Sequence, residues 1–300
     1  MEKSGLLTSL SAYEAKVVPG SSGTLCTVGI CVNASAAIDE RSWLVRSDLA
    51  EQSLEGLVRA PAFKAVVAMH GRLPITDIFA EATAGSERID QLVFGEAFDA
   101  LDRQTTSDGT DRIWGRARRD GVVGWIDRAA LKPGAPLATH RVASTSAVLP
   151  LNALIHHAWS GVSADDLMIT GEFERDPVAV AERMLGVPHE LGARTSRATD
   201  CSGLVQQALY ACGLAGPRRS DEQAQLGFAV ARDDLQRGDL VIWLHADTGQ
   251  SWTGHSALAL DADRLIHATG HAGCVVVEDL AEAAARYAAD GFAQPAFRRL

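Results

Sequence analysis

Residues 199–213, TDCSGLVQQALYACG, carry the pattern that decides the fold of this chain. The apolar positions fall on one face of a helix: Leu204, Val205, Ala208, Leu209 and Cys212. Asp200 is a typical N-terminal cap and Gly213 a typical stop. Cys201 therefore lies in the first turn of the predicted helix, where free N–H groups and the helix dipole favour a negative charge. This position predicts a lowered thiol pKa and a nucleophilic thiolate.

Two histidines further along the chain lie in short apolar or alternating runs. Four such runs, bounded by turn residues, predict one antiparallel sheet: 237–243, 253–260, 263–270 and 273–280. His255 opens the second run, and His267 lies near the end of the third, an even number of residues later. In a hairpin between these runs, both imidazoles fall on the same face and close together. One ring can then take the thiol proton of Cys201 while the other holds the first ring in its tautomer.

The motifs DCSGLVQ, RGDLV, GHSALAL and LIHA, in this order and spacing, resemble those of the NlpC/P60 family of cysteine peptidases. The resemblance covers residues 177–300. It implies a papain-like fold of the α+β class, in which the helix that bears the cysteine packs on an antiparallel sheet. It also implies that Cys201 is the nucleophile, His255 the base and His267 the orienting third residue. Asp200 and Ser202 match the positions beside the nucleophile that help to hold the substrate in the family.

The chain departs from the family pattern near the expected cleft. Where the family usually has Pro-Tyr-x-Trp-Gly-Gly, this chain has PHELGA, so His189 replaces a tyrosine and Leu191 an aromatic side chain. In PRRSDEQ, Arg219 replaces a carboxylate of the family's Pro-Arg-Asp-Ser-Asp, and Ser220 keeps its serine. The resemblance makes His189, Arg219 and Ser220 predicted substrate-binding residues. An arginine in place of a carboxylate predicts repulsion of a substrate's free amine.

The rest of the chain resembles the modules that often precede such peptidases. Short alternating runs and two tryptophans, Trp114 and Trp125, resemble a bacterial SH3-like barrel, and we expect the two tryptophans to fill its core. The predicted segments are an N-terminal extension of unclear role (1–70), the SH3-like barrel (71–134), a shortened second SH3-like unit (135–176) and the catalytic domain (177–300).

Composition and charge limit the partners. The chain is 47% hydrophobic and 22% charged, which is ordinary for a globular protein. A net charge of −10 argues against nucleic acid or an anionic membrane as partner. No apolar run approaches the ~18 residues of a membrane span, and the absence of an export signal at the N-terminus predicts a cytoplasmic location. The 5 cysteines fit reduced thiols, with no metal site and no cofactor expected. Oligomeric state is not predicted.

The resemblance implies a cysteine endopeptidase that hydrolyses the γ-D-glutamyl–L-diamino acid bond of murein peptides, in peptide recycling or cell-wall turnover. Two alternatives stay open. A related Cys–His amidase or acyl transferase with a changed substrate would account for the departures at His189, Leu191 and Arg219. A weakly active or non-catalytic peptide-binding scaffold would also tolerate them, although its catalytic trio would then have no reason to stay intact.

Overall fold

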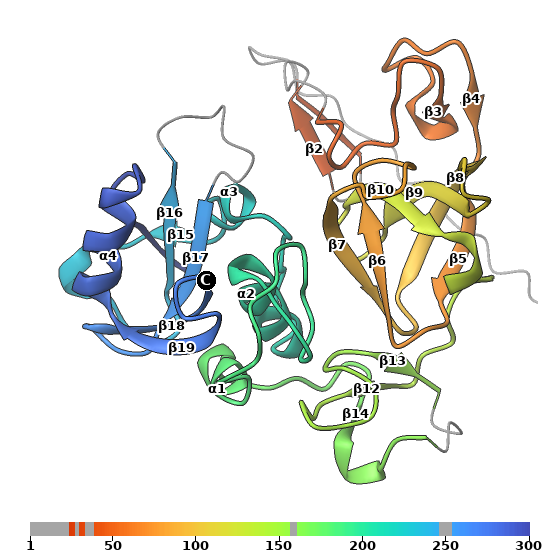
Figure 1. Ribbon diagram of the computed structural model, residues 1–300. Coiled ribbons are helices and arrows are strands. Elements are labelled where there is room, and N and C mark those ends of the chain that lie inside the picture. The colour runs from red at the N-terminus through yellow and green to blue at the C-terminus, as the bar shows by residue number, and fades with distance from the viewer. Residues whose placement is uncertain (1–23, 28–29, 34–38, 157–160, 246–253) are drawn as a thin grey trace, which may run out of the picture. The chain divides into compact units, whose positions relative to one another are not determined.

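The computed structural model describes residues 24–27, 30–33, 39–156, 161–245 and 254–300 (Figure 1). The chain divides into two compact units, Met1–Ile38 and Asp39–Leu300. In the first unit, β1 (Thr24–Thr27) pairs antiparallel with β2 (Ile30–Asn33). Part of the predicted extension 1–70 lies outside the described residues, and its role stays a prediction. Among the described helices, none has the length and apolar character needed to cross a membrane.

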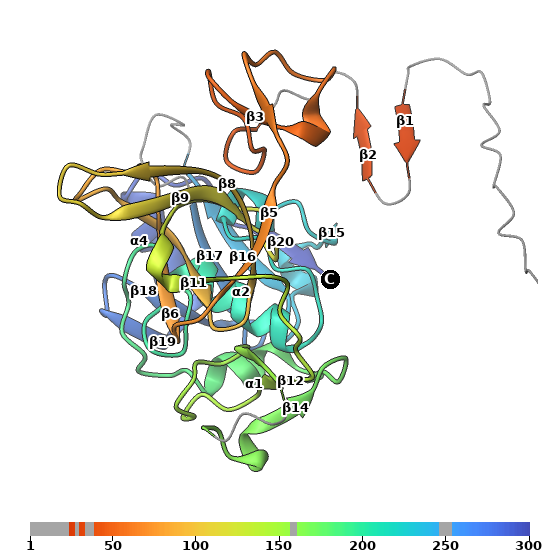
Figure 2. The ribbon, with the colours of Figure 1, turned by 90° about the vertical axis from the view of Figure 1, so that its right-hand side faces the viewer.

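The first large sheet of the second unit has seven strands in the order β11-β5-β8-β9-β10-β6-β7, all paired antiparallel. Its interior is apolar and includes Ile78, Phe98 and Ile126. Strands β8 and β9 form a long bent hairpin (Figure 2), with a register shift between Ala100 and Asp102. The strands are β5 (Val67–Gly71), β6 (Ile75–Phe79), β7 (Arg88–Val93), β8 (Ala97–Thr105), β9 (Asp111–Ala117), β10 (Val123–Asp127) and β11 (Leu131–Pro133).

Trp114 and Trp125 lie directly opposite each other on β9 and β10, but they belong to a separate apolar cluster. Both are buried against Leu44 and Leu49 of the segment that precedes the sheet. The guanidinium carbon of Arg46 lies 4.4 Å from the ring centroid of Trp114 and 5.4 Å from that of Trp125. The prediction that these tryptophans fill the barrel core is therefore wrong, because they anchor the preceding segment to the sheet. That segment contains the parallel pair β3 (Ala50–Glu51) and β4 (Phe63–Lys64).

A small three-stranded sheet, β13-β12-β14, follows the seven-stranded one. Its strands are β12 (His140–Val142), β13 (Leu154–Ile155) and β14 (Leu167–Ile169). Its core joins Val142 and Ile155 to Val93 of the large sheet. Buried Asn152 donates a 2.9 Å hydrogen bond to the backbone oxygen of Gln207 in the next region of the chain. The interpretation of this segment as a second SH3-like unit stays a prediction.

The last third of the second unit is a six-stranded antiparallel sheet between two layers of helices. Its order is β15-β20-β16-β17-β18-β19. Alternating residues divide between two cores: one faces α1 and α2, and the other faces α4 (Figure 1). The elements are α1 (Pro177–Glu182), α2 (Cys201–Ala211), α3 (Ser220–Gln223), β15 (Phe228–Ala229), β16 (Leu240–Leu244), β17 (Gly254–Ala259), β18 (Arg264–Thr269), β19 (Cys274–Asp279), α4 (Leu280–Ala289) and β20 (Ala296–Arg299). The α+β fold class and the predicted antiparallel sheet are confirmed.

Buried ion pairs join the seven-stranded sheet to the region of α2. Asp90 of β7 accepts on Oδ1 from Arg194 Nε at 3.0 Å and from Arg218 Nε at 2.7 Å. Arg194 is fully buried and also donates to Glu96 Oε2 at 2.6 Å. Arg218 donates to Asp200 Oδ2 at 2.5 Å. Because Asp200 caps α2, this network connects the large sheet to the start of the helix that carries Cys201.

Candidate active site

Cys201 is the first residue of α2, as the sequence predicts. The Asp200 side chain caps the helix by accepting from the Gly203 amide at 2.7 Å. Gly203 is required there, because a Cβ on it would lie 2.5 Å from the Ala193 oxygen. The Cys201 side chain keeps partial exposure, and the backbone amide of Ser256, next to His255 in β17, hydrogen-bonds its sulfur. The nucleophile candidate and the strand of the base candidate therefore meet.

The two predicted histidines lie together on the face of the sheet that α4 covers. His255 Nε2 is 2.8 Å from His267 Nδ1, and the rings meet edge to face at 88°. His267 is fully buried and His255 is 5% exposed. Leu258 pairs with Ile266, and this register puts His255 and His267 on the same face of the sheet. The two histidines are diagonal neighbours, because the position opposite His267 is two residues after His255. The even spacing in the sequence predicted this juxtaposition.

A carboxylate lies beyond the second histidine. Glu278 Oε2 of β19 is 2.9 Å from His267 Nε2, although it lies off the line of a well-aligned N–H hydrogen bond. Both Glu278 oxygens bind Arg286 of α4, and this contact lowers the pKa of Glu278 to about 2. The ring of Tyr287, the next residue, stacks on His255, and its hydroxyl lies 2.9 Å from His255 Nε2. No motif in the sequence points to Glu278, Arg286 or Tyr287.

Burial sets the protonation states of the site. It raises the pKa of the Cys201 thiol to about 11, and the adjacent Asp200 carboxylate adds to this rise. It also lowers the pKa of His255 well below its ordinary value, and lowers the pKa of His267 in spite of Glu278. The expected lowering of the thiol pKa by the helix N-terminus is therefore wrong for the free protein. The resting pair is a neutral thiol with a neutral imidazole, so the proton must move as the sulfur attacks.

Three of the predicted substrate-binding residues already have their side-chain polar groups hydrogen-bonded within the protein. Asp200 and Ser202 are buried, and both are bound to Arg218: Asp200 Oδ1 and Ser202 Oγ each accept from Arg218 Nη1 at 2.9 Å. Ser220 Oγ accepts from Ser256 Oγ at 2.8 Å, beside the base candidate. These three hydroxyl or carboxylate groups are therefore already engaged inside the protein, and their predicted contact with substrate stays a prediction.

His189 and Arg219 lie on the two loops that flank α2. The His189 amide donates to Gly273 O at 2.9 Å, and His189 forms an isolated parallel bridge with Thr199, two residues before Cys201. Burial lowers the pKa of His189, and its charge, when present, opposes protonation of His255. Arg219 Nη1 lies 3.3 Å from Glu222 Oε1, so its positive charge is paired. The repulsion predicted from Arg219 is thereby weakened.

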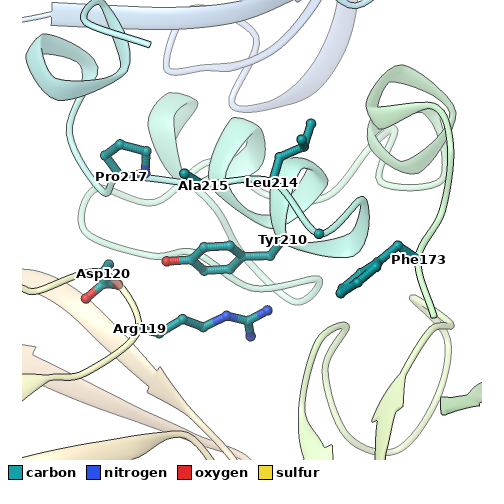
Figure 3. A pocket seen from close by; sticks show the side chains of 9 residues that line it. Arg119, Asp120, Phe173, Tyr210, Leu214, Ala215 and Pro217 are labelled. Carbon is teal, nitrogen blue, oxygen red and sulfur yellow. The ribbon is translucent and has the colours of Figure 1, made fainter. Parts of the chain in front are cut away.

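Two cavities on the described part of the chain are not lined by the catalytic candidates. The first, about 510 Å³, lies at the far end of α2 and is lined by Tyr210, with Arg119 below its ring and Phe173 to one side (Figure 3). The Arg119 guanidinium carbon is 3.9 Å from the Tyr210 ring centroid. The second, about 1030 Å³, lies between β5, β11 and the chain at 135–138 and 154–156. The catalytic candidates instead lie where α2 begins, partly open to solvent at Cys201.

Two stretches of this chain match known protein families. Residues 186–292 match the NlpC/P60 family, and residues 78–131 match the bacterial dipeptidyl-peptidase SH3 domain. A murein DD-endopeptidase/murein LD-carboxypeptidase of Escherichia coli K12 is 34% identical over 92 residues, 30% of this chain and 47% of that protein. A gamma-D-glutamyl-L-lysine dipeptidyl-peptidase of Bacillus cereus is 31% identical over 105 residues, 35% of this chain and 28% of that protein. The matches thus span less than half the length of these relatives.

A solved structure extends the likeness over both domains. An NlpC/P60 family protein from Bacillus cereus superposes with a TM-score of 0.61 over 77% of this chain and 99% of that chain, at 15% identity. At this identity the likeness establishes the fold. Along the chain, the match to the bacterial SH3 domain precedes the match to the NlpC/P60 family, which is the order that the sequence motifs predict.

Proposed function

We propose that this chain, whose residues 186–292 match the NlpC/P60 family and whose residues 78–131 match a bacterial SH3 domain, is a cysteine peptidase acting on peptidoglycan-derived peptides. The observation that carries the proposal is the imidazole pair, in which His255 Nε2 lies 2.8 Å from His267 Nδ1. The amide of Ser256, the residue after His255 on the same strand, binds the Cys201 sulfur. A nucleophile, a base and an orienting group are the three parts that covalent hydrolysis of an amide needs.

The proposed reaction begins with attack of the Cys201 sulfur on the scissile carbonyl. His255 takes the thiol proton as the C–S bond forms and gives it to the nitrogen of the leaving amine as the C–N bond breaks. A water molecule then attacks the thioester, with His255 accepting its proton and returning it to the sulfur. His267 accepts the hydrogen bond from His255 Nε2–H throughout and stabilises the imidazolium that forms. The free N–H groups at the start of α2 are suited to bind the oxyanion.

For the bond that is cut, we propose the γ-D-glutamyl–L-diamino acid linkage. The name of the Bacillus cereus relative, a gamma-D-glutamyl-L-lysine dipeptidyl-peptidase, supports this class of substrate. The pairing of Arg219 with Glu222 supports it as well, because a paired guanidinium repels a substrate amine less than a bare one. Within this proposal, the recycling role and the cytoplasmic setting stay predictions from the sequence.

The test is hydrolysis of L-Ala-γ-D-Glu-diaminopimelate by the purified full chain. We expect cleavage after D-Glu, a loss of at least about a thousandfold in Cys201→Ala, and none in Cys212→Ala, a matched change at the other end of α2. An N-acetylated peptide, run in parallel, reports whether a free amine is needed. An inert protein whose Cys201 still reacts selectively with iodoacetamide would instead support an amidase or acyl transferase. Loss of that selectivity as well would support the scaffold hypothesis.

A further inference from the structure

Two consecutive residues of α4 support the imidazole pair. Tyr287 contacts His255 itself, and Arg286 binds Glu278, which lies beside His267. The Tyr287 oxygen lies 2.9 Å from His255 Nε2, and its ring stacks on that imidazole with centroids 4.4 Å apart and planes inclined by 29°. Arg286 Nη2 donates to Glu278 Oε2 at 2.7 Å, and Glu278 in turn lies 2.9 Å from His267 Nε2. Each histidine therefore has a support that depends on α4, on the face of the sheet away from α2 (Figure 1).

These contacts decide which nitrogen of each ring carries a proton. The ionised Glu278 carboxylate can only accept, so His267 Nε2 must carry the hydrogen. Neutral His267 then has its lone pair on Nδ1, which must accept from His255 Nε2–H. The Tyr287 oxygen, at the same nitrogen, must accept as well. His255 is thereby left with its lone pair on Nδ1, the state that a general base requires.

We propose that Arg286 and Tyr287 act as positioning residues, together an α4 clamp, that fix His255 in the Nε2–H tautomer and so make it a base for Cys201. The inference rests on the proposed Cys201–His255 pair and deepens it. The clamp has two arms: Tyr287 acts on His255 directly, and Arg286 acts through Glu278 and His267.

Several other groups face His255 and could obscure a change in its titration. From β18 it faces His267, from β19 Glu278, from α4 Arg286 and Tyr287, and from the loop before α2 His189. Cys201 lies within electrostatic reach of Tyr287. A measurement that reports the tautomer of His255 directly is therefore needed beside any pH profile.

The arms of the clamp predict different outcomes. Tyr287→Phe keeps the stacked ring and removes one acceptor from His255 Nε2–H, so we expect about a tenfold fall in the rate of Cys201 alkylation, the value of one hydrogen bond. Glu278→Gln offers a side chain that can either donate or accept, which permits the opposite tautomer in both rings. There we expect a larger fall and a measurable population of His255 Nδ1–H. In peptide hydrolysis, kcat should fall in both variants with little change in KM.

The experiment measures iodoacetamide alkylation of Cys201 from pH 5 to 9, together with the imidazole 15N chemical shifts of His255, in the full chain. Tyr210→Phe is the matched control: it removes the hydroxyl of another buried tyrosine, one with no hydrogen-bond partner, at the far end of α2. Tyr287→Phe should change the profile and Tyr210→Phe should not. If Tyr287→Phe and Glu278→Gln both keep the native profile and tautomer, the clamp is overturned. If Cys201 in the native protein is no more reactive than Cys212, the proposed function fails, while the 15N shifts still test the clamp.

Discussion

The buried network between the two large sheets predicts that Asp90 is protonated in the folded protein at mildly acidic pH. Three arginines face four carboxylates there, so one negative charge is in excess: Arg119, Arg194 and Arg218 against Asp90, Glu96, Asp120 and Asp200. Both arginines that reach Asp90 donate to Oδ1, whereas Oδ2 is buried without a hydrogen-bond partner. Protonation of Oδ2 therefore breaks no existing hydrogen bond. Burial raises the pKa of Asp90 to about 7.

The size of the pH-dependent change in the free energy of unfolding follows from this pKa. Between the ordinary Asp value of 3.8 and about 7, the folded protein binds a proton that the unfolded chain releases. This contribution to stability is complete below about pH 4 and is lost as pH rises through 7, and it corresponds to at most about 4 kcal/mol. Asp90→Asn keeps the Oδ1 acceptor and removes the titration. We expect the variant to be about 1 kcal/mol less stable than the native protein near pH 4.5, because its amide N–H groups lack partners, and more stable than the native protein at pH 8.

The assay is urea denaturation at pH 4.5, 6, 7 and 8, followed by tryptophan fluorescence, since buried Trp125 and Trp243 report the two sheets. Glu96→Gln is the control: both Glu96 oxygens bind Arg194, so the variant should lose about 3–5 kcal/mol at each pH. If the difference between Asp90→Asn and the native protein is constant from pH 4.5 to 8, Asp90 is ionised in the folded protein and the charge count fails.

Two further predictions concern the domain that carries Cys201. Because Arg286 lowers the pKa of Glu278 from 4.5 to about 2, the stability from this pair is present above pH 4.5 and is lost as pH falls toward 2. Glu278→Gln should therefore remove about 2 kcal/mol of acid-dependent stability, and thermal unfolding at pH 3 and pH 6 that shows equal losses would count against this. Gly203→Ala places a Cβ 2.5 Å from the Ala193 oxygen and 2.9 Å from Arg194 Cα, so it should cost about 1–3 kcal/mol; a melting temperature equal to that of the native protein would refute the close approach.

Much of the six-stranded sheet that carries His255 and His267 could be predicted because its sequence signals are local. The runs around His255 and His267 have the alternation of strands with two covered faces, and an even spacing fixes the face on which each histidine lies. The start of α2 was equally clear, since Asp200 caps it. These features depend on neighbours within a few residues or on a single hairpin, so the sequence contains them.

The charged contacts could not be predicted in the same way. Arg194 and Glu96 are 98 residues apart and buried together, yet the sequence marks both as surface residues. Arg286 and Tyr287 lie in AEAAARYAAD, which has the composition of an ordinary exposed helix. The prediction of a lowered thiol pKa was wrong for a related reason. The helix N-terminus is visible in the sequence, whereas the burial that outweighs it at Cys201 depends on how the domain packs.

Arg218 contacts both the large sheet and the start of α2. It binds Asp90 of the large sheet and Asp200 beside Cys201, and its charge lowers the pKa of the thiol while that of Asp200 raises it. When Asp90 ionises above pH 7, Arg218 is shared between two carboxylates, and its effect on Cys201 weakens. Asp90→Asn removes this competition, so the pH profile of Cys201 alkylation should shift to lower pH in that variant. The domain that contains Asp90 would then influence the Cys201 thiol through a single buried guanidinium.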